Sequence, residues 1–292
     1  MKTVSSVDEK DDSTWKGGRI NESVRCVVAD NPSPMTNVGT NSWVVSQRDT
    51  GNCYLIDPGP NSSSHIKALI AACEQDELHI SAILLTHDHP DHGGSAKKLS
   101  GITKAPVFSK RTESLQYGPF QLEESCPYLE VISLKGHSRD SVGFVFPETR
   151  SVFTGDTLFK QSPTMISWPD GKLEDYFESL ENLAQLMNTK GYLNLLTGHG
   201  EPVDEPLAII EHTVKHRQDR LSAVKDSASN SKVLGIRRTW EDVYFDGNKM
   251  LSFAARINVL AQLKYLQKIN DPSVEGKEYD LYSRFMIWLM TR

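Results

Sequence analysis

The chain has 292 residues, of which 38% are hydrophobic and 24% are charged. This length and hydrophobic content are sufficient for one large domain and a second, smaller one. No apolar run approaches the roughly 20 residues that a helix needs to span a bilayer, which argues against an integral membrane protein.

Charge is unevenly distributed along the chain. Residues 1–204 contain 18 Lys and Arg against 27 Asp and Glu, a net charge of −9, whereas residues 205–292 contain 14 against 11, a net charge of +3. An acidic N-terminal portion is a poor surface for a phosphate backbone. The mildly basic C-terminal portion is explained by a solvated helix face, so nucleic acid is an alternative partner that the charge does not favour.

The N-terminal segment 1–20 is predicted to be a disordered lead. Its first twelve positions carry four acidic residues and no apolar core region, so it is neither a signal peptide nor an Arg-rich transit sequence. We therefore expect a cytoplasmic protein. In that compartment reduced, structural thiols are expected at the four cysteines, Cys26, Cys53, Cys73 and Cys126.

A catalytic domain is predicted over 21–225, and it begins with short strands and one helix. Apolar runs bounded by turn residues predict strands at 24–29, 41–45 and 53–56. Apolar residues at helical spacing, preceded by serines that can cap them, predict a helix at 65–77. In and after the Pro-rich loop at 31–41, Met35 and Trp43 are candidate substrate neighbours, although ordinary turn chemistry is favoured for most of these residues.

A cluster of metal-ligating residue types follows the apolar run at 80–85, which predicts a buried strand. The cluster reads Thr86-His87-Asp88-His89-Pro90-Asp91-His92-Gly93-Gly94. Crowding several ionisable groups at the end of a buried strand is costly unless something binds them. A hydrogen-bonded core histidine or a surface histidine would explain one His, but not three beside a carboxylate. Because imidazole and carboxylate suit zinc and its first-row neighbours, the segment predicts half of a two-metal site.

Three further candidate ligands follow predicted strands. His137 comes after the apolar run at 129–134, and Asp156 and His199 lie in glycine turns that end two later strands. Each of these positions alone is a weak signal, because Gly-His and Gly-Asp are common in turns. Together with the first cluster they are a strong one, since side chains at the ends of several strands can converge at one edge of a sheet.

This set of motifs resembles the binuclear metallo-hydrolase branch of the metallo-β-lactamase superfamily, over about residues 25–215. The resemblance implies an α/β fold, a four-layer αβ/βα sandwich with two divalent metal ions at one edge of its sheets. It implies that the first ion is held by His87, His89 and His137. It implies that the second ion is held by Asp91, His92 and His199. Asp156 would bridge the two ions, with zinc favoured and iron or manganese as alternatives.

The resemblance also indicates which branch is closer. Where class B β-lactamases carry a Cys ligand and an Arg after the motif Asp, this chain has Asp156 and His92. That departure counts against antibiotic hydrolysis and favours the glyoxalase II, lactonase and nuclease side. Asp57 resembles the family's carboxylate that orients ligand imidazoles. Asp91 and Asp88 are the catalytic candidates, Asp88 as a supporting residue or proton shuttle.

The rest of the chain is predicted to be mainly helical. Apolar periodicity predicts helices at 170–190, 205–224 and 251–269. Met165 and Trp168, before the first of these, could form a substrate wall, with buried packing as the alternative for Trp168. A Ser-rich linker is predicted at 227–231. Segment 226–292 resembles the small, mainly helical, winged-helix-like C-terminal domain of lactamase-beta-2-type proteins, and it could pack on the catalytic domain or form a homodimer.

The expected chemistry is hydrolysis by a metal-bridging hydroxide. A single bound zinc ion lowers the pKa of water from 15.7 to about 7, so hydroxide becomes available at neutral pH. An ester or thioester is the favoured substrate, because the acidic catalytic portion and the apolar loop residues suit an uncharged or mixed small molecule. The alternatives are a single-strand-specific endoribonuclease of the lactamase-beta-2 type and a non-enzymatic metal-binding sensor, which is favoured least.

Overall fold

A computed structural model of the chain describes residues 14–47, 49–192, 194–244 and 252–291. The first 13 positions of the expected disordered lead lie outside these ranges. The chain divides into two compact units. Unit 1 comprises Met1–Ile132, Val142–Pro163 and Leu193–Asp204. Unit 2 comprises Ser133–Ser141, Thr164–Tyr192 and Glu205–Arg292.

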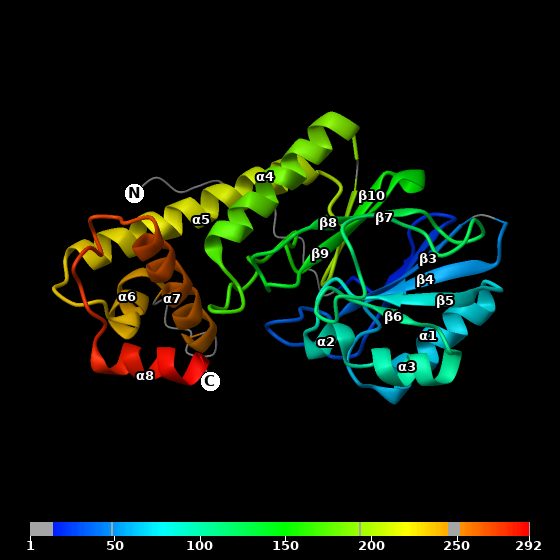
Figure 1. Ribbon diagram of the computed structural model, residues 1–292, viewed down its shortest axis with the longest axis horizontal. Coiled ribbons are helices and arrows are strands. Elements are labelled where there is room, and N and C mark those ends of the chain that lie inside the picture. Colours follow the sequence, from blue (N-terminus) through cyan, green and yellow to red (C-terminus); the bar gives the residue numbers. More distant parts are fainter. Residues whose placement is uncertain (1–13, 48, 193, 245–251, 292) are drawn as a thin grey trace. The chain divides into compact units, whose positions relative to one another are not determined.

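Unit 1 is built on two β-sheets (Figure 1). The six-stranded sheet has the order β1-β2-β3-β4-β5-β6, with strands Gly17–Arg19, Val24–Val28, Asn41–Ser46, Asn52–Ile56, His79–Leu84 and Val107–Phe108. The five-stranded sheet has the order β11-β10-β9-β8-β7, with strands Asn194–Thr197, Ser151–Gly155, Val142–Phe146, Leu129–Ser133 and Gly118–Phe120. Because β1 pairs with β2, the last part of the expected lead is ordered.

The parallel strand pairs explain why distant motifs meet. In the first sheet β4 and β5 are parallel, with Ile56 opposite Leu84. In the second sheet β10 and β11 are parallel, with Gly155 opposite Thr197. Parallel neighbours end at the same edge of a sheet, so the residues that follow two such strands come together. Each sheet therefore brings two segments that are far apart in the sequence to one edge.

The main core of unit 1 lies between the two sheets. Alternate residues of the strands point into it, as the two-residue period of a strand requires. Its larger members include Trp43, Tyr54, Phe144 and Phe153. Trp43 is 1% exposed and packs edge to face on Phe153, with ring centroids 5.8 Å apart. The expectation that Trp43 neighbours a substrate is therefore wrong, because the residue belongs to the core.

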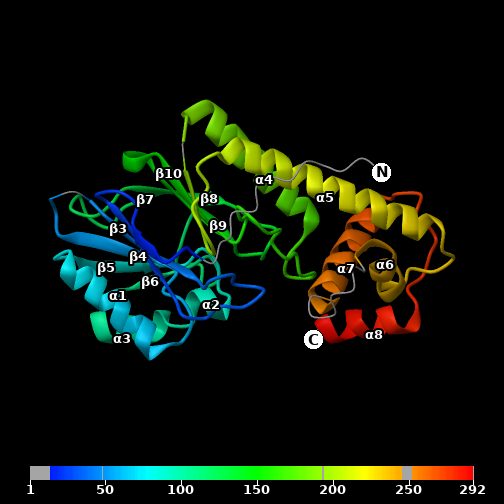
Figure 2. The same cartoon turned by 180° about the vertical axis from the view of Figure 1, so that it is seen from behind.

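The opposite face of the six-stranded sheet is covered by helices. Helices α1 (Ser63–Gln75) and α3 (Ala96–Thr103) lie side by side on this face in both views (Figure 1; Figure 2). Ser62 caps α1, because its side chain accepts a hydrogen bond from the backbone N–H of His65. The predicted helix at 65–77 is thus confirmed within two residues. The short helix α2 (Pro90–Gly93) falls inside the His-rich cluster.

Unit 2 is helical. Its helices are α4 (Leu173–Lys190), α5 (Pro206–Ser229), α6 (Ile236–Tyr244), α7 (Ser252–Lys268) and α8 (Leu281–Met290). The second apolar cluster, with Trp240, Leu260 and Leu263, joins α5 to α8. The expected α/β sandwich with a helical C-terminal region is therefore confirmed. None of the helices in the described ranges is long and apolar enough to cross a membrane.

The predicted linker at 227–231 is wrong for its first three residues. Helix α5 continues to Ser229 because the small side chains of its last turns pack inward. Ala228 is buried in the core of unit 2, and the Ser227 hydroxyl donates a hydrogen bond to Asp242. The domain boundary that the sequence predicted after residue 225 falls inside this helix. Domain limits, as distinct from the compact units, stay a prediction.

Candidate metal centre

A buried carboxylate organises the edge of the six-stranded sheet. Asp57 follows β4 and has a left-handed backbone, with φ of 52°. Its Oδ1 accepts a hydrogen bond from the backbone N–H of Thr86 at 2.8 Å, and its Oδ2 accepts one from the Thr86 hydroxyl at 2.6 Å. The same Oδ2 lies 2.9 Å from Nδ1 of His92. An Nδ1–H that is donated to Asp57 leaves Nε2 of His92 as the lone pair that can bind a metal.

Four of the predicted ligands converge beside Asp57. Asp91, His92, Asp156 and His199 each offer one ligand atom, and these atoms lie within 4.8 Å of one another. Nε2 of His92 is 3.1 Å from Oδ1 of Asp156, and Nε2 of His199 is 3.4 Å from Oδ2 of the same residue. Nε2 of His199 is also 3.4 Å from Oδ2 of Asp91. One carboxylate therefore faces an imidazole with each of its oxygens.

Glycine makes this close approach sterically feasible. A Cβ atom on Gly198 would lie 2.2 Å from Oδ1 of Asp156 and 2.7 Å from Cε1 of His92. No side chain fits at that distance, so only glycine allows the turn after β11 to pass the carboxylate. The ring of His199, the next residue, is oriented by its Nδ1, which lies 3.1 Å from the carbonyl oxygen of Gly39.

The donor set fits a divalent cation. Within the described ranges, Nε2 of His92 and Nε2 of His199 are buried and make no hydrogen bond. A buried polar atom without a partner costs about 1–3 kcal/mol, so two such atoms aimed at carboxylates call for a ligand. Imidazole nitrogens mixed with carboxylate oxygens are donors that zinc, iron and manganese accept. The residues present therefore fit a metal ion.

The pKa shifts of three of these groups agree with this fit. Burial alone would raise the pKa of Asp156, but the facing His199 and His92 hold it well below its usual value. Burial alone would lower the pKa of His199, but the Asp156 carboxylate raises it to about 9. The pKa of His92 is likewise raised, against burial, by Asp156 and Asp57. The carboxylates and the imidazoles therefore stabilise each other's charged forms.

Metal affinity is expected to increase with pH up to about 9. A cation must displace the proton that His199 retains below its raised pKa of about 9, so protons compete with the metal throughout the neutral range. The competition should weaken apparent affinity by about tenfold per pH unit for each proton displaced. Zinc titrations against a competing chelator at pH 6, 7, 8 and 9 would measure this slope. An affinity that is constant over that range would contradict it.

Two further predicted ligands lie beside these four in unit 1. Nε2 of His87 is 3.1 Å from Nδ1 of His89, and the ring of His87 lies 4.2 Å from that of His92 between centroids. Nδ1 of His87 is 3.1 Å from the Thr86 hydroxyl. The catalytic candidate Asp88 lies in the same turn, and its carboxylate pairs with Nε of Arg111 at 3.1 Å.

The seventh predicted ligand, His137, belongs to unit 2. It is buried in the loop between β8 and β9. Its Nδ1 lies 2.8 Å from the carbonyl oxygen of Met165 and 3.2 Å from the hydroxyl of Thr164. With Nδ1–H donated to the Met165 carbonyl, Nε2 is again the nitrogen left for a metal. The assignment of the seven side chains as metal ligands stays a prediction.

Several neighbours of the site match no motif in the sequence. Phe159 lies with its ring 5.5 Å from that of His199. The next residue, Lys160, is 3.4 Å from Glu201 and 3.4 Å from Asp204. Their only sequence signal is their position shortly after Asp156. Of the expected substrate neighbours, Met35 is 45% exposed, and Trp168 packs against the core of unit 2.

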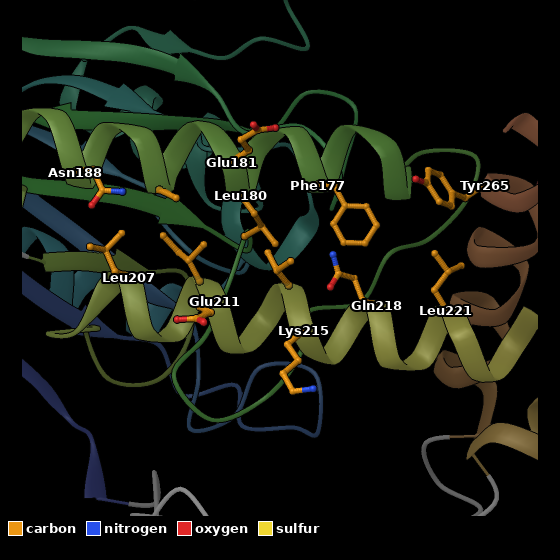
Figure 3. A pocket seen from close by; sticks show the side chains of 13 residues that line it. Phe177, Leu180, Glu181, Asn188, Leu207, Glu211, Lys215, Gln218, Leu221 and Tyr265 are labelled. Carbon is orange, nitrogen blue, oxygen red and sulfur yellow. The ribbon is translucent and has the colours of Figure 1, made fainter. Parts of the chain in front are cut away.

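A separate groove of about 1,100 Å³ lies in unit 2 (Figure 3). It runs between α4 and α5, with Tyr265 of α7 at one end. Its apolar walls include Phe177, Leu180, Ile210 and Val214. None of the predicted ligands lines it. The groove is therefore not the centre of the predicted chemistry.

Comparison with known proteins gives a consistent result. Residues 35–129 match the model of the metallo-beta-lactamase superfamily. The chain is 26% identical over 278 residues to a beta-lactamase-like protein 2 homolog of Caenorhabditis elegans, covering 90% of each chain. It is 27% identical over 205 residues to an atrochrysone carboxyl ACP thioesterase of Aspergillus fumigatus, covering 66% of this chain and 61% of that one. A metallo-beta-lactamase family protein of Thermus thermophilus has a similar fold, with a TM-score of 0.70, 20% identity and coverage of 86% and 95%.

Proposed function

The chain belongs to the metallo-β-lactamase superfamily, and on that basis we propose that it is a metal-dependent hydrolase that acts on an ester or thioester. The observation that carries the proposal is the convergence of Asp91, His92, Asp156 and His199 at the edge of the sheets. Buried imidazole nitrogens without hydrogen bonds face carboxylate oxygens there. A centre of this composition is suited to hydrolytic chemistry.

We assign seven side chains to two divalent ions. One ion would be held by His87, His89 and His137. The other would be held by Asp91, His92 and His199. Asp156, whose oxygens face the His92 and His199 imidazoles of the second ion, would also contact the first ion, as the family resemblance implies. When bound, such ions acidify a water molecule and polarise the oxygen of the scissile group.

The chain's own residues orient the ligands and handle protons. Hydrogen-bond acceptors hold the Nδ1–H groups of three imidazoles: Asp57 for His92, the Gly39 carbonyl for His199 and the Met165 carbonyl for His137. Burial would raise the pKa of Asp91, but His199 lowers it below its usual value, so the carboxylate is ionised at neutral pH. Asp91 is 30% exposed and can accept a proton from the attacking water. Asp88, held by Arg111, would support this turn.

The charge around the centre favours an uncharged acyl group over a phosphodiester. Lys160, the cation that follows the Asp156 turn, is paired with Glu201 and Asp204. Its charge is therefore neutralised and offers little attraction to a phosphate backbone. A relative is named as an acyl-carrier-protein thioesterase, which also supports a thioester substrate. Cleavage of single-stranded RNA is the alternative, and its support is the resemblance to lactamase-beta-2-type proteins, together with 26% identity to a beta-lactamase-like protein 2 homolog.

One panel of assays separates the two activities. Zinc-loaded protein would be tested on aryl esters, acyl thioesters and a fluorescent single-stranded RNA at two salt concentrations. We expect turnover of thioesters that depends on metal and is insensitive to salt. RNA cleavage that falls steeply with added salt would favour the nuclease. Metal-replete protein that hydrolyses none of the three substrates would overturn the hydrolase proposal.

A further inference from the structure

The support of His137 comes from helices of unit 2 that no sequence motif marks. Residues 164–166 form a short strap beside the imidazole. Nδ1 of His137 lies 2.8 Å from the Met165 carbonyl oxygen and 3.2 Å from the Thr164 hydroxyl. Whatever fixes the strap therefore fixes the ring plane of His137 and the direction of its Nε2.

Arg217, on α5, holds the strap from one side. The side chain is 6% exposed, and its guanidinium donates a hydrogen bond to the carbonyl oxygen of Thr164. The guanidinium carbon also lies 5.3 Å from the centroid of the Tyr176 ring, a cation–π distance. Burying the charge of an arginine costs free energy unless the guanidinium is paired or hydrogen-bonded. Here it joins a strap carbonyl to an aromatic ring of α4.

The loop that carries His137 packs directly against Tyr176. A Cβ atom on Gly136 would lie 2.4 Å from Cα of Tyr176, so the loop touches the backbone of α4 directly. Gly136 has φ of +132°, and its carbonyl oxygen accepts a hydrogen bond from the backbone N–H of Lys172 at 2.9 Å. Arg217 thus contacts both supports of the imidazole, which are the strap and the start of α4.

Asn258, on α7, holds the strap at a second point. Its Oδ1 accepts a hydrogen bond from the backbone N–H of Ile166 at 3.0 Å, and Ile166 is buried. Helices α5 and α7 therefore fix the residues on either side of Met165. The Met165 carbonyl, which orients His137, therefore lies between two held residues. Arg217 is 53 positions after Thr164 in the sequence, and Asn258 is 92 positions after Ile166.

We propose that Arg217 and Asn258 are positioning residues that set the direction of Nε2 of His137. They thereby control the affinity of the ion that His137 would bind. This inference rests on the proposed function only in taking His137 as a metal ligand. It gives the helical unit a part in the chemistry, because the helices hold one ligand in its binding orientation.

The test measures metal binding by the full-length chain, with cobalt as the probe. In Arg217→Met, one cobalt ion should bind as in the unmodified protein, and the other about 10–100-fold more weakly. The visible absorption of the weaker ion should change because the angle of an imidazole donor has changed. Arg217→Lys should not restore binding, since an ammonium cannot bond the strap and stack on Tyr176 as a planar guanidinium does.

Two further variants separate positioning from general destabilisation. Asn258→Ala removes the acceptor for Ile166 and should weaken the same cobalt ion, whereas Asn258→Asp keeps an acceptor oxygen and should restore it. Arg256→Met is the matched control, because Arg256 lies 4.6 Å from the Trp240 ring centroid and donates to the Tyr282 hydroxyl. It should leave both ions unchanged.

The outcomes are distinct from those of the hydrolase proposal. If Arg217→Met fails to fold, the Asn258 pair decides the question. Two ions bound at unmodified affinity in both Arg217→Met and Asn258→Ala would overturn the inference, whatever the turnover. Weakened binding of one ion, in a protein that hydrolyses none of the substrates, would keep the positioning role and reject the hydrolase.

Discussion

Asp156→Ala is expected to bind fewer than two metal ions and to lose hydrolysis by about 1,000-fold or more, equivalent to several kcal/mol of transition-state stabilisation. The reason is that this carboxylate faces both imidazoles assigned to the second ion, Oδ1 towards His92 and Oδ2 towards His199. The family resemblance implies that it also contacts the first ion. No neighbouring side chain can replace both contacts. Elemental analysis of chelator-free protein, together with turnover of the best thioester, would measure the two effects.

The control for Asp156 is Asp271, a carboxylate of equal burial outside the site. Both residues are 8% exposed, and Asp271 is paired with Lys225 at 2.8 Å in unit 2. Asp271→Ala should lower stability and leave metal content and turnover unchanged. Two ions and ordinary turnover in Asp156→Ala would show that the carboxylate does not join the ions. Equal losses in both variants would point to unfolding.

The ligand cluster could be predicted because its signal is local. His87, His89, Asp91 and His92 lie within six residues of one another, directly after a strand whose apolar run is unambiguous. Asp156 and His199 could be added because each follows a strand through glycine. Their convergence depends on the parallel pairing of β10 with β11, which the structure shows and no local pattern predicted.

The parts that could not be predicted depend on contacts between distant residues. Trp43 lies in a strand of six buried residues, where no alternation tells core from cleft. The last turn of α5 is Ser-rich and has the composition of a linker, but it is ordered by a contact from Ser227 to Asp242. Arg217 and Asn258 have ordinary helical surroundings in the sequence. Only the folded chain shows that they hold the strap beside His137.

Two elements, β7 and α8, were not predicted from the sequence for the same reason. The short strand β7 contains Pro119, which argues against a strand in the sequence but is tolerated at the edge of a sheet. Helix α8 is apolar on several sides, so no single stripe marked it as amphipathic. In both cases the structure of the segment depends on where it packs in the fold, and no local sequence pattern indicates that place.

Asp57→Asn is expected to reduce metal affinity and turnover by about 10–100-fold, the usual effect of removing a group that orients a metal-bound histidine. The carboxylate accepts hydrogen bonds from the Thr86 backbone and hydroxyl and from Nδ1 of His92. An amide has one accepting oxygen, so its NH₂ group would face a donor and the imidazole would lose its fixed orientation. Calorimetric zinc titration and kcat would measure the change.

The choice of Asn isolates this effect from backbone strain. Asp57 has φ of 52°, a conformation that Asn tolerates nearly as well as Asp, whereas Ala would add strain. Asp49 is the matched control, because it is also an Asp with a left-handed backbone, φ of 60°, but is exposed. Asp49→Asn should change neither affinity nor turnover. If Asp57→Asn bound zinc as tightly as the unmodified protein, the Asp57 carboxylate would not be needed to orient His92. Its role would then be limited to its hydrogen bonds with Thr86.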